Sequence, residues 1–188
     1  LRQNAEGNGY SVVLQDMSFI SGSTPVFHVN QCYQGDEDMA ELLRNKKFRQ
    51  ALSIAIDRDE LNEFITLGLS ETRQAVLADD YPGCSNELSQ KYTEFNLEKA
   101  SKWLDEIGLE KNEKGWRTFP GTDKEIMLIL NPCGVEGAQT DAAQLTKPKF
   151  EKIGIKTVVK PIERSLWLQR VWGGDHQIAL YSVANGFR

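Results

Sequence analysis

Apolar residues recur at helical spacing on both sides of Asp57, within the stretch 43–68. Asp57 is placed to end the first of two helices and cap the second, because its carboxylate can accept a hydrogen bond from the N–H of Glu60 while Glu60 reaches back. Gly68 can supply the left-handed residue that stops the second helix. The pattern predicts two helices with almost no linker, whose charges at 57–60 cap helices or face solvent. The apolar faces comprise Phe48, Ala51, Leu52, Ala55 and Ile56, and then Leu61, Phe64 and Ile65.

Three further segments carry helix signals. Asn96 is placed to cap a helix over 97–108, whose apolar residues repeat on one face. Residues 137–153 are helical in pattern, and Pro148 lies inside that pattern, where it can kink the helix. Residues 164–172 form a short helix that is closed by two glycines.

Five segments have the alternating or β-branched composition of strands. They cover residues 10–14, 25–30, 125–130, 155–162 and 176–184. From residue 125 onward strands and helices alternate, which is typical of an α/β layer with right-handed crossovers. We therefore expect one α/β domain over residues 1–188, a mixed sheet flanked by helices.

Composition narrows the functional classes. The chain has 188 residues, of which 40% are hydrophobic and 26% charged, as in an ordinary soluble globule. Its net charge is −5, and no basic patch indicates a nucleic-acid surface. No apolar run approaches the ~18 residues of a membrane span. The chain begins at Leu1 without a signal peptide, so we expect an excised fragment of a longer protein.

Candidate catalytic chemistry is sparse. The cysteines Cys32, Cys84 and Cys133 are far apart and form no CxxC pair, so their disulfide state stays open. Cys133 or Cys84 could pair with His176 as a thiol nucleophile, but no local motif supports that enzyme. No spaced His/Cys cluster indicates a metal, and no phosphate-binding loop is present. We expect no cofactor, no metal and no enzyme.

Several motifs in order resemble the family 5 extracellular solute-binding proteins. The stretch around Asp57 is similar to that family's signature segment, and four later segments continue the match over most of the chain. The matching residues are Arg49-Gln50-Ala51-Leu52, Ala55-Ile56-Asp57-Arg58, Phe95-Asn96-Leu97-Glu98-Lys99-Ala100, Gly115-Trp116-Arg117, Phe150-Glu151-Lys152-Ile153-Gly154-Ile155-Lys156 and Gly174-Asp175-His176-Gln177-Ile178-Ala179-Leu180-Tyr181.

The resemblance implies a receptor of a peptide-type ABC importer. Such a receptor has a two-lobed, periplasmic-binding-protein-like fold that closes over a small solute, an oligopeptide, oligosaccharide or related compound. This chain would be the second lobe. The parent would be a monomer, periplasmic or a cell-surface lipoprotein, and would deliver solute to a membrane permease. The same domain can also serve as the sensor of a transcriptional regulator.

Two places follow strands of the expected sheet, and ligands sit at the carboxyl ends of strands in open α/β sheets. Glu163 and Arg164 open a helix there, and the last strand leads into Tyr181, Ser182, Asn185 and Gly186, the turn that lines the cleft in the resembled family. Some peptide-binding members carry an aspartate in that turn that pairs with the peptide amino terminus. Asn185-Gly186 has no acid, so a zwitterionic peptide anchored there is in doubt. We predict that these six residues contact the solute.

Each candidate also has a structural interpretation. Glu163 can be a helix-start acid and Arg164 a surface cation. Trp167 and Trp172 on the same helix can pack in the core or stack on a sugar ring.

Overall fold

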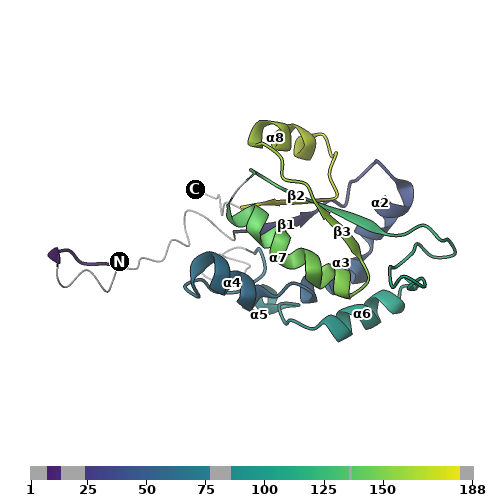
Figure 1. Ribbon diagram of the computed structural model, residues 1–188, viewed down its shortest axis with the longest axis horizontal. Helices are drawn as coiled ribbons and strands as arrows, with labels where there is room; N and C mark the ends of the chain where they lie inside the picture. The colour runs from purple at the N-terminus through teal and green to yellow at the C-terminus, as the bar shows by residue number, and fades with distance from the viewer. Residues whose placement is uncertain (1–7, 14–23, 77–85, 136, 183–188) are drawn as a thin grey trace.

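The computed structural model describes residues 8–13, 24–76, 86–135 and 137–182, in which a four-stranded sheet carries helices on both faces (Figure 1). The strands are β1 (Val26–Val29), β2 (Met127–Pro132), β3 (Lys156–Val159) and β4 (Ile178–Tyr181). The helices are α2 (Glu37–Arg44), α3 (Lys46–Ile54), α4 (Arg58–Thr66), α5 (Asn86–Gln90), α6 (Leu97–Asp105), α7 (Ala138–Lys152) and α8 (Arg164–Trp172). Within the described ranges, no helix has the length and apolar character that crossing a membrane requires.

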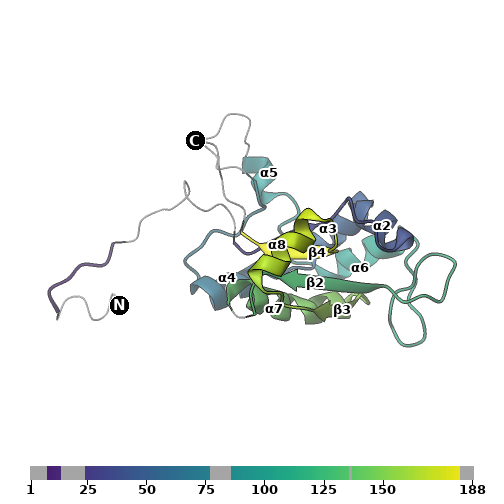
Figure 2. The same ribbon diagram turned by 90° about the horizontal axis from the view of Figure 1, so that it is seen from above.

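The sheet is mixed, as the sequence predicts. Its strand order is β1-β4-β2-β3, in which β2 is parallel to both β3 and β4 while β1 is antiparallel to β4. The connection through α7 leads from β2 to one neighbour, and the connection through α8 returns to the other. Right-handed connections in opposite directions place their helices on opposite faces. Figures 1 and 2 show α8 on one side of the sheet and α7 with α3 and α6 on the other.

Alternating side chains of the central strands supply two cores. Leu128 and Leu130 of β2 are fully buried in the larger core, together with Leu180 of β4 and apolar residues of α2, α3, α6 and α7. Ala179 of β4 points to the other face, where it joins Trp167 of α8 in a smaller cluster. This period of two is what a strand buried on both faces requires.

The strand predictions are only partly correct. Residues 25–30 contain β1, and the three later strands occur, but β2 is shifted two residues toward the C-terminus of the predicted 125–130. β3 and β4 are shorter than predicted in their described parts: β3 covers the residues that pair with β2, and β4 covers those that pair with β1. Residues 183 and 184 of the predicted last strand lie outside the described residues. The strand expected over 10–14 is wrong in its described part, since residues 10–13 form no strand. Leu14 lies outside the described residues.

The joint at Asp57 has the predicted cap. Oδ1 of Asp57 accepts from the backbone N–H of Glu60 at 3.1 Å, at the start of α4. The carboxylate of Glu60, expected to reach back, lies 2.7 Å from Nζ of Lys149 on α7. The left-handed end of α4 starts one residue before Gly68, because Leu67 itself has φ of 56°.

Two residues near that joint differ from expectation. Arg58, expected to face solvent, is partly buried, and its guanidinium donates to the carbonyl oxygen of Ser53 at 2.8 Å and to the Ser53 hydroxyl at 2.9 Å. Burial lowers the pKa of Arg58. Phe64, expected on the buried face of α4, is 62% exposed, and α4 buries none of its side chains completely. Leu61 and Ile65, also expected on that face, are partly buried and pack against the larger core, so α4 lies at the periphery of the core.

Arg117 is a fully buried cation that sequence patterns did not reveal. Its Nη2 donates to the carbonyl oxygen and the hydroxyl of Ser101 on α6, at 3.0 and 2.7 Å, and its Nη1 lies 2.7 Å from Oδ1 of Asp105. The same guanidinium donates to the carbonyl oxygens of Leu109 and Ile153. Arg117 thus joins α6, the following loop and the end of α7.

Candidate functional site

Three parallel strands end side by side, and we call this place the carboxyl edge: the ends of β2, β3 and β4 with residues 133–134, 162–164 and 181–182. Backbone hydrogen bonds continue past the strands here. The N–H of Cys133 donates to Leu180 at 3.0 Å, and the N–H of Gly134 donates to Ile162 at 2.7 Å. These hydrogen bonds hold the backbone of the carboxyl edge in place, and the side chains described next project from it.

Two aromatic rings lie at the centre of the carboxyl edge. Trp167 is 6% exposed, and its indole N–H donates to the carbonyl oxygen of Asn131 at 2.9 Å. The ring of Tyr181, which is partly exposed, lies 5.1 Å from that of Trp167 with a tilt of 43°. The guanidinium of Arg164 lies 6.0 Å from the centre of the Tyr181 ring. The buried Trp167 packs against Tyr181, and the Tyr181 ring makes a cation–π contact with Arg164.

Glu163 caps α8. Its Oε2 accepts from the N–H of Ser165 at 2.8 Å and of Leu166 at 3.4 Å, and its Oε1 lies 3.3 Å from the Ser165 hydroxyl. These hydrogen bonds, led by that from the Ser165 N–H, lower the pKa of Glu163. The carboxylate is thus directed at the start of its own helix.

Ser182 joins the end of β4 to the segment before β1. Its hydroxyl donates to Oγ1 of Thr24 at 3.0 Å. Because β1 and β4 are antiparallel, the start of β1 near Thr24 and the end of β4 near Ser182 lie at the same end of the sheet.

The structure brings together four of the six predicted ligand residues, namely Glu163, Arg164, Tyr181 and Ser182. Asn185 and Gly186 lie outside the described residues. Reasoning from sequence did not connect Cys133 and Thr24 with this edge. Cys133 directly follows a buried strand, a signal that could have placed it here, whereas only antiparallel pairing of β1 with β4 brings in Thr24.

The two tryptophans of α8 have different environments. Trp167 packs in the core at the carboxyl edge. Trp172 is 80% exposed and belongs to the last turn of α8, about 12 Å along the helix from Arg164. Among the two, only Trp167 is close to the predicted ligand residues.

The Cys133–His176 nucleophile pair is wrong. Cys133 follows the end of β2, whereas His176 precedes β4, and the strand register puts about five residues, roughly 16 Å, between them. Burial raises the pKa of the Cys133 thiol, which opposes formation of a nucleophilic thiolate. Cys84, the other thiol considered, lies outside the described residues.

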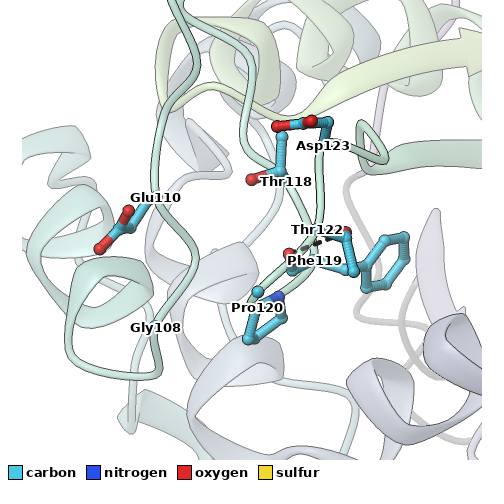
Figure 3. A pocket seen from close by; sticks show the side chains of 8 residues that line it. Gly108, Glu110, Thr118, Phe119, Pro120, Thr122 and Asp123 are labelled. Carbon is cyan, nitrogen blue, oxygen red and sulfur yellow. Dashed lines mark hydrogen bonds between the residues drawn. The ribbon is translucent and has the colours of Figure 1, made fainter.

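A hollow of about 580 Å³ lies at the opposite end of β2 from the carboxyl edge (Figure 3). It is lined by Gly108, Glu110, Thr118, Phe119, Pro120, Gly121, Thr122 and Asp123. Its two carboxylates, Glu110 and Asp123, do not converge in Figure 3, and the Thr122 hydroxyl donates to Phe119 O at 3.0 Å. Within the described ranges, no group of three or more His, Cys, Asp or Glu side chains could hold a metal. We therefore favour the carboxyl edge.

The mixed sheet with flanking helices is a fold that this chain shares with periplasmic binding proteins, which are its structural neighbours. The chain belongs to the family described as bacterial extracellular solute-binding proteins, family 5, whose middle-region model matches residues 5–187. The resemblance carried by the sequence motifs is thereby confirmed. This family consists of solute-binding proteins rather than enzymes.

Relatives of known name agree with the family. The oligopeptide-binding protein AppA of Bacillus subtilis is 25% identical over 159 residues, 81% of this chain and 28% of that protein. The periplasmic alpha-galactoside-binding protein of Rhizobium meliloti is 28% identical over 147 residues, 69% of this chain and 20% of that protein. A solved oligopeptide-binding protein OppA superimposes with a TM-score of 0.86 at 29% identity, covering 97% of this chain and 28% of that one. The chain thus spans about a quarter of the length of these relatives.

Proposed function

We propose that this chain is the solute-binding lobe of an ABC importer receptor, and that Arg164, Tyr181 and Ser182 contact the solute. The observation that carries the proposal is that Arg164, at the start of α8, lies beside Tyr181, at the end of β4 and next to Ser182, at the carboxyl edge of a chain that belongs to the family. Open α/β sheets bind ligands at this edge.

A second lobe would complete the cleft. The relatives are several times longer than this chain, and Thr24 and Ser182 lie side by side, where two connecting segments would cross to the other lobe. A solute that contacts both lobes favours the closed state by its differential affinity. The receptor would act as an extracytoplasmic monomer that hands solute to a membrane permease, without catalysis.

The solute would be an oligopeptide or an oligosaccharide, because relatives named for each kind match this chain. Glu163 keeps its predicted place at the edge, but its carboxylate is occupied by α8, so it contributes to the shape of the site more than to ligand contact. Asn185 and Gly186 remain predicted contacts.

A titration of the ¹⁵N-labelled chain followed by NMR tests the site. The probes are a tetrapeptide pool and an oligosaccharide pool at millimolar concentration, where a single lobe still gives measurable shifts. We expect shifts for the amides of Arg164 and Ser182 and for the indole N–H of Trp167. Shifts confined to the hollow lined by Gly108 and Asp123, or no shifts with either pool, would refute the proposed site.

A melting assay on the full receptor tests the function. Ligand binding to the native state raises Tm by mass action. We expect one solute class to raise the Tm of the two-lobed protein and to leave that of this chain nearly unchanged. Turnover of a solute by the receptor would contradict a purely binding role.

A further inference from the structure

At the carboxyl edge, the positive charge of Arg164 is not part of an ion pair among the described residues. The residue is exposed, and no carboxylate of the described residues lies within ion-pair distance of its guanidinium. By contrast, Arg117 lies 2.7 Å from Asp105, and Arg170, on the same helix, is 3.9 Å from Asp175. Removing Arg164 would therefore break no internal ion pair among the described residues.

The neighbouring acid does not cancel this charge by direct pairing. Glu163 is next to Arg164 in sequence, but its oxygens accept from Ser165 and Leu166 at the start of α8. The Arg164 guanidinium lies over the Tyr181 ring. The two side chains are thus committed to different neighbours.

The aromatic pair next to Arg164 is itself well anchored. Tyr181 packs on Trp167, and Trp167 is buried and hydrogen-bonded to Asn131. A guanidinium that rests on an aromatic ring keeps its N–H donors free, and its planar fork matches the two oxygens of a carboxylate.

We propose that Arg164 binds a carboxylate of the solute, so that the lobe selects an acidic solute over its neutral analogue. This inference rests on the proposed function, since it concerns the same edge. It assigns the edge to the anionic end of a solute, because an ammonium group would meet the like charge of Arg164 there.

The test uses two scaffolds, each in an acidic and a neutral form. The first pair is N-acetylated tetra-alanine with a free or an amidated carboxyl terminus, and the second is maltotetraonic acid and maltotetraitol. Dissociation constants are measured by NMR titration of the ¹⁵N-labelled chain. For at least one scaffold we expect the acid to bind about tenfold more tightly than its neutral partner, as one charge-assisted hydrogen-bonded pair would give.

Three variants locate the effect. Arg164→Gln should abolish the preference for the acid, so that the acidic and neutral partners bind the variant with equal affinity. Arg164→Lys should retain part of it, because the charge remains and the fork is lost. Arg170→Gln, the matched control on the same helix, should bind as the parent does. Thermal unfolding verifies that each variant is folded.

The outcomes separate this inference from the proposed function. Equal affinity for acid and neutral forms, with shifts at the carboxyl edge, overturns the role of Arg164 and leaves the solute-binding site in place. A preference that survives Arg164→Gln also overturns it. No shift at the edge with any of the four probes overturns both.

Discussion

Nε of Arg117 donates to the carbonyl oxygen of Ile153 at 2.7 Å, although the two residues are 36 positions apart. This bond fixes the turn before β2 to the end of α7, while the other guanidinium nitrogens hold α6. A single buried side chain thus connects elements that the larger core also joins through apolar contacts.

Replacing Arg117 by methionine should destabilise the chain strongly. The carbonyl groups of Leu109 and Ile153 would lose their donor, and each buried acceptor left unsatisfied costs about 1–3 kcal/mol. Urea unfolding measures the change. Arg170→Met is the control, because the half-exposed pair of Arg170 with Asp175 should contribute less than about 1 kcal/mol. Equal losses of unfolding free energy in the two variants would contradict a large contribution of the Arg117 network to stability.

Asp57→Ala should lower the free energy of unfolding by about 1 kcal/mol, because the N–H of Glu60 at the start of α4 loses its acceptor. Asp59→Ala removes an acid from the same turn without removing a cap, so it should cost only a few tenths of a kcal/mol. Chemical denaturation of both variants makes the comparison. A smaller loss for Asp57 than for Asp59 would contradict the assigned cap.

Leu67→Gly should stabilise the chain by about 0.5–1 kcal/mol. Leu67 is 76% exposed and has φ of 56°, a left-handed conformation that costs a side-chain-bearing residue free energy which glycine avoids. Leu69→Gly is the control, since Leu69 is 67% exposed but does not have a positive φ. It should be neutral or destabilising. The thermal midpoints of the two variants decide, and a lower midpoint for Leu67→Gly would disprove the explanation.

Stability should fall as the pH drops below about 6.5, the ordinary pKa of imidazole. Burial lowers the pKa of both His28 and His176 in the folded chain. As the pH falls, the unfolded chain therefore binds protons before the folded chain does, and this shifts the equilibrium toward the unfolded state. Nδ1 of His176 is buried without a hydrogen-bond partner, and Asp175 and His28 are the titratable groups that act on this imidazole.

Urea unfolding at about pH 7.5 and about pH 5.5 checks this dependence, since most carboxylates titrate lower. The parent should be less stable at the lower pH, and His176→Gln should reduce the difference. A pH-independent free energy of unfolding over this window would contradict the buried, uncharged state of the histidines.

Local signals in the sequence were sufficient for much of the helical structure. Asn96 caps α6 through a hydrogen bond to the N–H of Lys99 at 2.8 Å, and α8 occupies the predicted 164–172. Both depend on neighbours within a few positions, which a sequence displays directly. Arg117 could not be recognised in this way, because its partners come from separate elements that only the folded chain brings together.

The candidate site was likewise predictable where it depends on local position in the sequence, and not where it depends on contacts between distant elements. Glu163 and Arg164 follow one predicted strand, and Tyr181 and Ser182 lie near the end of another, so their positions at strand ends suggested a common edge. The proximity of Arg164 to the Tyr181 ring depends on β4 lying two strands from β3, across β2, and on α8 covering that face. The capping role of Glu163 had a local signal, since the residue directly precedes the helix.

The hydrogen bond between Thr24 and Ser182 has a consequence for protein engineering. A unit whose two connections lie at one point can be moved between polypeptides, because a host chain has little distance to bridge and the entropy of closing it is small. We expect that residues 24–182, spliced into an exposed loop of an unrelated protein, would leave both partners folded. The lobe would then be a transplantable recognition module.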